Sequence, residues 1–176
     1  LVEFLPEENG DNYEYLYQVK AMAKESGFEY YAKVAWRKGT FVANTGRKAK
    51  NTEDILFFSK GRARDMRPDA KKDKAEPEMK HYMSGAKGML PTAFDIQPIS
   101  KADRVHQSEK PVELLKQILE FVSDKKELVL DQYAGSFALA EAALESERDS
   151  ISIEISQDYF EEGKKRIENV KKGKVR

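Results

Sequence analysis

Two apolar stretches that each end in a carboxylate, Leu128–Asp131 and Ile151–Glu154, constrain this chain more than any other feature. The first is followed at once by Tyr133–Phe137, a glycine-containing turn, and then by a stretch typical of a helix. The order strand, turn, helix, strand requires a parallel pair with a right-handed crossover. Such a turn brings backbone N–H groups close to a nucleotide-like ligand, and a carboxylate one strand away can accept hydrogen bonds from ribose hydroxyls. The alternative is an ordinary strand–turn–helix with a capping acid.

Hydrophobic periodicity predicts further elements along the chain. We expect loop or irregular structure over residues 37–51 and 62–107, where charged residues, Gly and Pro replace the apolar pattern. The fold class is therefore α/β, with a mostly parallel sheet and helices on both faces. Expected strands are Leu1–Leu5, Phe28–Trp36, Asp54–Ser59, Leu128–Leu130 and Ser150–Ile155, and expected helices are about 11–26, Pro111–Val122, Ala138–Leu144 and Asp158–Asn169.

Composition excludes several classes of site. The 176 residues contain no cysteine and two histidines, so neither a disulfide framework nor a thiolate or multi-histidine metal site is expected. No apolar run is long enough for a membrane span, and no signal-peptide pattern is present. We expect a cytoplasmic protein without a membrane partner.

Charge is distributed unevenly along a chain whose formal net charge is zero. Residues 33–87 carry 15 basic and 7 acidic side chains, a net charge of +8, whereas the segments before and after carry −5 and −3. A basic block of this kind indicates a surface that faces a polyanion, although most charge runs are simply solvated.

Several segments, in the same order, resemble the β-class DNA amino-methyltransferases. Val105–Leu115 resembles their H-x-T-Q-K-P-x-x-L-L segment, Asp131–Phe137 stands in the place of their D-P-F-x-G-S-G loop, and Ile151–Ile155 is similar to I-G-I-E-x. Upstream, Val34–Lys38 and Glu53–Lys60 resemble the V-W-x-K and E-Y-I-L-x-F-S-K strands. These enzymes, of restriction-modification or phage type, methylate adenine N6 or cytosine N4 in DNA with S-adenosylmethionine.

The resemblance implies a role for individual residues. It places S-adenosylmethionine against the turn at Tyr133–Phe137 and against Glu154, with the 106–111 segment near the methionine carboxylate. It places target recognition in the basic block. His106 is expected to anchor its loop by hydrogen bonds and not to catalyse. The implied cofactor-binding residues are Asp131, Tyr133, Ala134, Gly135 and Ser136 (methionine part), Glu154 (ribose), Ile155 (adenine), and His106, Ser108, Lys110 and Pro111; the implied DNA contacts are Arg47, Lys48, Lys50, Arg62, Arg64 and Arg67.

The resemblance also implies an organisation in three parts. Residues 1–61 would form the second half of a Rossmann-like methyltransferase sheet. Residues 62–105 would be an irregular basic insertion for target recognition, and residues 106–176 the cofactor-binding half.

Two departures from the family pattern matter. Phe137 stands where the family has glycine, so its side chain must either crowd the cofactor or pack away from it. The D-P-P-Y or S-P-P-Y catalytic loop occurs nowhere in the sequence, which therefore resembles the C-terminal portion of such an enzyme. By resemblance, the catalytic-loop strand would lie between the strands at 1–5 and 128–130. We expect a missing N-terminal segment or a second chain to supply it; the alternatives are that the two strand edges close on each other or that the gene is truncated. A homodimer is a further expected partner, and the isolated chain is expected to be inactive.

The expected function of the parent protein is methyl transfer from S-adenosylmethionine to an exocyclic amino group of a base flipped out of double-stranded DNA, with adenine as the expected target. Two alternatives remain. One is a non-catalytic DNA- or cofactor-binding remnant of such an enzyme. The other is a methyltransferase that acts on RNA or a small molecule.

Overall fold

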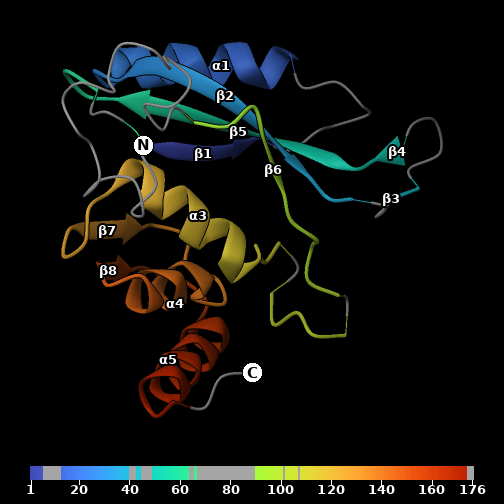
Figure 1. Cartoon of the computed structure of the whole chain (residues 1–176), viewed down its shortest axis with the longest axis vertical. Coiled ribbons are helices and arrows are strands. Elements are labelled where there is room, and N and C mark those ends of the chain that lie inside the picture. The colour runs from blue at the N-terminus through green and yellow to red at the C-terminus, as the bar shows by residue number, and fades with distance from the viewer. Residues whose placement is uncertain are drawn as a thin grey trace, which may run out of the picture. The chain divides into compact units, whose positions relative to one another are not determined.

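A computed structural model describes residues 1–5, 13–39, 43–44, 49–63, 66, 90–100, 102–106 and 108–173 (Figure 1). The chain divides into two compact units. Unit 1 comprises Leu1–Asp65 with Leu90–Gln97, and unit 2 comprises Met66–Met89 with Pro98–Arg176. Among the described residues, no helix has the length and apolar character that a membrane crossing requires.

Unit 1 contains a four-stranded mixed sheet in the order β1-β5-β2-β6. The strand β5 is antiparallel to both of its neighbours, and β2 is parallel to β6. The expectation of a mostly parallel sheet is therefore wrong for this unit. The strand β6 was also missed, because it is short and lies in a segment without periodicity. The strands are β1 (Val2–Leu5), β2 (Glu29–Arg37), β5 (Thr52–Ser59) and β6 (Ala93–Asp95), and β3 (Ala43–Asn44) pairs with β4 (Ala49–Lys50) in a separate two-stranded sheet within the segment expected to be a loop.

The core of unit 1 follows from four consecutive apolar residues in β5, Ile55–Phe58, all of them buried. Such a run fits a central strand that is covered on both faces. Leu56 and Phe58 pack with Ala23 of α1 (Tyr13–Glu25). The helix ends at Glu25, one residue before the end expected from the sequence. Gly27, whose φ of 79° is left-handed, follows it, and the N–H of Phe28 donates to the carbonyl of Ala23 at 2.8 Å.

Unit 2 has the predicted βαβα order. The strands β7 (Leu128–Asp131) and β8 (Asp149–Ser152) are parallel, with α4 (Ala138–Glu145) between them in the chain. The helices α3 (Val112–Val122) and α5 (Gln157–Lys171) precede and follow this pair. The ladder ends three residues before the predicted end of the second strand, although the N–H of Ile153 still donates to the carbonyl of Asp131 at 2.8 Å.

Helix packing and a buried arginine fix unit 2. Helix α3 buries the apolar side chains of Leu114, Leu115, Ile118 and Leu119 and packs against α4, where Ala142 and Ala143 allow close approach. Arg148, which is 4% exposed, donates to the carbonyls of Ser123 (2.9 Å) and Ser146 (2.5 Å) just after these helices. Carbonyls at helix ends lack intrahelical partners, so this side chain satisfies groups that burial would otherwise penalise.

One face of the β7–β8 pair stays exposed. Leu128, Leu130, Ile151 and Ile153 project to the same face and are 49% to 62% exposed. In the part of the chain that the structure describes, β7 pairs with β8 alone, so its other edge carries no ladder. A contiguous exposed apolar face beside a strand edge is typical of a surface that another polypeptide covers.

Candidate functional site

The turn after β7 is fastened to the end of β8 by backbone hydrogen bonds. The N–H of Ala134 donates to the carbonyl of Ile153 at 2.9 Å, and the N–H of Tyr133 donates to Oδ1 of Asp131 at 3.1 Å. A carboxylate that accepts from the residue two positions later closes a tight turn. The predicted turn therefore lies directly beside the strand that carries the second acid.

Glu154 is the residue that joins the two halves of the site. Its Oε2 accepts from the N–H of Gly135 at 2.7 Å, and its Oε1 accepts from the N–H of Ser156 at 2.8 Å. Hydrogen bonds from the N–H groups of Ser156, Gly135 and Ile155 outweigh desolvation and lower the pKa of Glu154. An ionised carboxylate offers about four acceptor positions, and three N–H groups use three of them, so this one retains about one position for a ligand hydroxyl.

The second acid of the site has the opposite electrostatic character. Burial raises the pKa of Asp131, and the negative charge of Glu154 raises it further, against a hydrogen bond from Tyr133. The site thus contains one carboxylate whose charged form is favoured by hydrogen bonds and one whose charged form is opposed by burial and by a neighbouring negative charge. A positively charged ligand group near Asp131 would be favoured there.

His106, the first residue of the 106–111 segment, lies against the turn. The φ of Gly135 is 49°, and a Cβ on this residue would lie 3.3 Å from Cγ of His106. The ring of His106 meets that of Tyr159 edge to face at 4.6 Å, and its Nδ1 accepts from the N–H of Ser108 at 3.1 Å. These contacts agree with the expected anchoring role of His106.

Phe137 packs away from the turn. Its side chain is 7% exposed and clusters with Ala134 and Ala140, and its ring meets that of Phe160 edge to face at 5.8 Å. Gly163 on α5 makes room for it, because a Cβ there would lie 2.4 Å from Cγ of Phe137. Of the two alternatives for this residue, packing in the core is the one that occurs. Its φ of 60° is left-handed, which explains why a glycine suits this place.

The remaining predicted cofactor residues surround the turn in different ways. Ser136 is buried, whereas the side chains of Tyr133 and Ile155 are 90% and 101% exposed. Lys110 and Pro111 lead into α3, where Pro111 is the N-cap residue. Ile155, which the resemblance assigns to adenine, is therefore open to solvent.

The predicted DNA contacts are largely outside the described residues. Arg47, Lys48, Arg64 and Arg67 lie there, and only the backbone of Lys50 is described, in β4. Arg62 is exposed.

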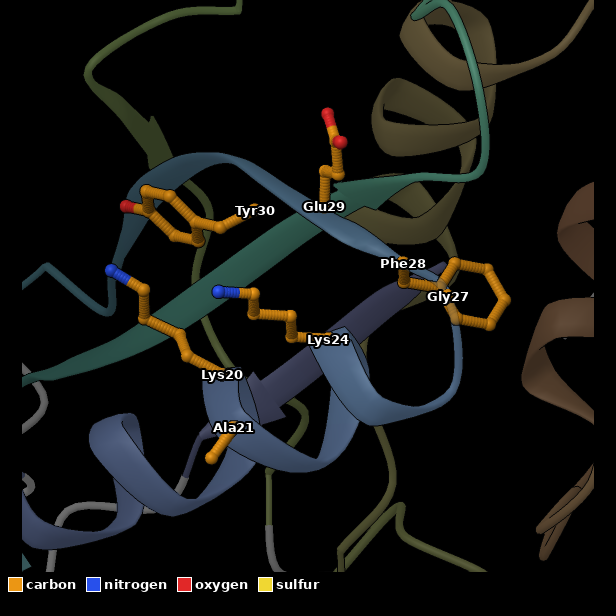
Figure 2. Close-up of a pocket in the computed structure, with 7 residues that line it drawn as sticks. All are labelled: Lys20, Ala21, Lys24, Gly27, Phe28, Glu29 and Tyr30. Atoms are coloured by element: carbon orange, nitrogen blue, oxygen red, sulfur yellow. The ribbon is translucent and has the colours of Figure 1, made fainter.

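A pocket in unit 1 does not coincide with the predicted site. Figure 2 shows Lys20 and Lys24 of α1 beside Phe28, Glu29 and Tyr30 at the start of β2. The Nζ of Lys20 lies 4.1 Å from the centre of the Tyr30 ring, a cation–π contact that occupies this lysine. The residues that line this pocket include neither the glycine-containing turn nor the paired acids, which lie in unit 2. Unit 2 therefore contains the candidate functional site.

Sequence reasoning missed a buried charge cluster behind the turn. Arg166 of α5 forms ion pairs with Glu109 and Glu141. The one sequence signal was Glu141, a charged residue among the apolar residues of the predicted helix Ala138–Leu144.

Comparison with known proteins supports the geometry. A family model described as DNA methylase matches residues 7–165. The chain is 40% identical over 63 residues to the DNA adenine methyltransferase YhdJ of Escherichia coli, covering 36% of the chain and 21% of that protein. It is 23% identical over 159 residues to the type II methyltransferase M.HpaI of Haemophilus parainfluenzae, covering 87% and 50%.

The fold is similar to that of a solved structure. The crystal structure of M1.HpyAVI in complex with S-adenosylmethionine superposes with a TM-score of 0.69 at 23% identity, over 94% of this chain and 72% of that one. The chain spans half or less of the length of the two curated relatives named above.

The contact between Phe137 and Gly163 predicts a coupled effect on stability. Gly163→Ala should destabilise the chain by about 1–3 kcal/mol, because the added methyl group overlaps the Phe137 ring. In a Phe137→Ala background the same substitution should cost less than about 0.5 kcal/mol, the limit for independent sites. Urea unfolding of the four proteins of this double-mutant cycle measures the coupling. Additive effects would contradict the packing described for this ring.

Proposed function

Because this chain belongs to the DNA methylase family, we propose that its unit 2 binds S-adenosylmethionine. S-Adenosylmethionine is the methyl donor of this family, and when bound it supplies an electrophilic methyl group on sulfur. The observation that carries the proposal is the Glu154 carboxylate, which is hydrogen-bonded to the turn through Gly135 and is still able to accept from a ligand hydroxyl.

The residues of the site fit the parts of this ligand. Glu154 holds the ribose hydroxyls, and the exposed side chain of Ile155 offers an apolar surface to adenine. Asp131, whose charged form burial disfavours, gains from the positive charge of the ligand. The backbone of Ala134–Ser136 and the 106–111 segment enclose the methionine part. Phe137 does not obstruct this arrangement, because its ring packs toward α5.

Cofactor binding is tested by titration calorimetry with S-adenosylmethionine. We expect Glu154→Ala to weaken binding at least about tenfold, since it removes charge-assisted hydrogen bonds both to the ligand and to the turn. Glu162→Gln on α5 is the matched control, because Glu162 is exposed and its ion pair in the described part of the chain is with the exposed Lys165. An absence of binding by the wild-type chain would refute the proposed pocket.

We propose double-stranded DNA as the substrate, with adenine as the target base. The similarity to a DNA adenine methyltransferase supports the choice of adenine, and the net charge of +8 over residues 33–87 supports contact with phosphates. The predicted contacts are Arg47, Lys48, Lys50, Arg62, Arg64 and Arg67. The cytoplasmic location expected from the sequence remains a prediction.

DNA binding is tested by fluorescence anisotropy with a labelled duplex over a range of salt concentrations. Each Arg→Gln or Lys→Gln substitution that removes a phosphate-binding charge from the basic set should reduce the slope of log K against log salt by about 0.9. Lys164→Gln and Lys165→Gln on α5 serve as controls outside that set. Affinity that hardly changes with salt would instead favour the alternative of a small-molecule substrate, and tighter binding of a matched RNA would favour an RNA substrate.

We further propose that this chain works together with a polypeptide segment that carries the catalytic loop. The D-P-P-Y or S-P-P-Y pattern is absent from the sequence, and the exposed apolar face of β7–β8 adjoins the unpaired edge of β7 in the described structure. A strand pairing with β7 would satisfy its free N–H and C=O groups, and an apolar helix on the face would remove Leu130 and Ile151 from water.

Methyl transfer from tritiated S-adenosylmethionine to duplex DNA tests this division of labour. The isolated 176 residues should transfer no label, because the group that holds the target amine is absent. A chain extended before Leu1 by a segment that carries the D-P-P-Y or S-P-P-Y loop should transfer label, and amide hydrogens of Leu128–Leu130 should exchange more slowly in it. Transfer by the isolated chain would refute the proposal. DNA binding without turnover in the extended chain would favour the non-catalytic remnant.

A further inference from the structure

A buried arginine behind the turn connects both walls of the proposed cofactor site. The side chain of Arg166, on α5, is 9% exposed, and its partners Glu109 and Glu141 are 1% and 10% exposed. Its Nη1 donates to Oε1 of Glu109 at 2.5 Å and to the carbonyl of Ser136 at 3.2 Å. A single nitrogen atom therefore bonds to the turn after β7 and to the segment that carries His106.

Glu109 transmits this contact to His106. Its Oε2 accepts from the N–H groups of Val105 at 2.9 Å and His106 at 3.3 Å, while its own N–H donates to the carbonyl of His106 at 3.0 Å. Burial opposes ionisation, but the hydrogen bonds from Arg166 and from these backbone groups prevail and lower the pKa of Glu109. The carboxylate thus fixes the backbone conformation of Val105 and His106.

The geometry requires a guanidinium. Nε of Arg166 donates to Glu141 on α4, and Nη1 donates to Glu109 and to the carbonyl of Ser136. One planar group therefore bonds to three segments of unit 2 in fixed directions. A lysine ammonium is a point charge and cannot reproduce that fork. Removal of the cation would also leave two buried carboxylates without their ion-pair partner.

We propose that Arg166 is a positioning residue for the cofactor site: it sets the distance between the His106 segment and the Gly135–Ser136 backbone. The inference rests on the proposed function, in which these two walls enclose the methionine part of the ligand. Arg166 itself lies behind the turn and acts through Glu109 and Ser136. Its role is directed to one part of the ligand, because Glu154, at the ribose, is also held by the N–H groups of Ser156 and Ile155, to which Arg166 makes no hydrogen bond in the described part of the chain.

Two ligands that differ only in the amino-acid part test this role. S-Adenosylhomocysteine and 5′-methylthioadenosine share adenine and ribose, but only the first has the amino-acid group. Arg166→Lys should weaken S-adenosylhomocysteine binding by about tenfold, because the walls around the amino-acid part are misplaced. The affinity for 5′-methylthioadenosine should stay within about twofold of the wild-type value. Titration calorimetry at one pH and salt concentration measures both constants.

Arg148→Lys is the matched control. Arg148 is also a buried arginine of unit 2, but it serves the carbonyls of Ser123 and Ser146. Its substitution should lower stability and leave the ratio of the two affinities unchanged. If Arg166→Lys does not fold, Glu109→Gln provides the second variant, since it keeps the volume of the side chain and weakens its bond to the guanidinium.

The outcomes separate the two proposals. Equal weakening of both ligands by Arg166→Lys, or no weakening, would overturn the positioning role while leaving the cofactor site intact. If the wild-type chain binds neither ligand, the proposed function fails. In that case the backbone amide NMR signals of His106, Ser108 and Gly135 still decide whether Arg166 fixes the two walls. They should shift in Arg166→Lys and not in Arg148→Lys, and unchanged signals would overturn the inference.

Discussion

The bond between the Glu154 carboxylate and the N–H of Gly135 is the interaction on which the site depends. It links the end of β8 to the turn after β7, and so fixes the relative position of two residues that are 19 apart in the sequence. The same carboxylate accepts from Ser156 at the N-cap of α5. Because both oxygens already have backbone donors, the side chain is oriented before any ligand arrives, which reduces the ordering cost of binding.

Phe137 shows how a departure from a family pattern can be accommodated. A glycine is favoured at this position because the backbone is left-handed, with φ at 60°. A Phe side chain is tolerated because Gly163 leaves the required space on α5. The burial of an aromatic ring offsets the backbone strain of about 1–2 kcal/mol per left-handed residue. The turn thus gains an anchor to α5 that a glycine would not provide.

The sequence predicted the elements that carry strong local signals. The strand–turn–helix–strand order of β7, α4 and β8 and the termination of α1 before Gly27 are confirmed, because periodicity and glycine placement are local properties. The strand β6 was missed, since three residues paired with β2 depend on a partner distant in sequence. Local sequence patterns likewise do not show that β5 is antiparallel to its neighbours. Arg166 and its partners were missed because Glu109 and Arg166 are 57 residues apart.

Local chain topology positions one part of the site, and contacts between residues distant in sequence position the other. Asp131, the turn and Glu154 lie within one βαβ unit, so their convergence follows from the right-handed crossover alone. The His106 segment has no such constraint, because it precedes α3 and reaches the turn only through tertiary contacts. Among its described contacts, the Glu109–Arg166 pair and the packing of His106 on Gly135 supply that constraint. One part of the proposed site is therefore specified by chain topology, and the other part by a buried ion pair. The second part is the more sensitive to a single substitution.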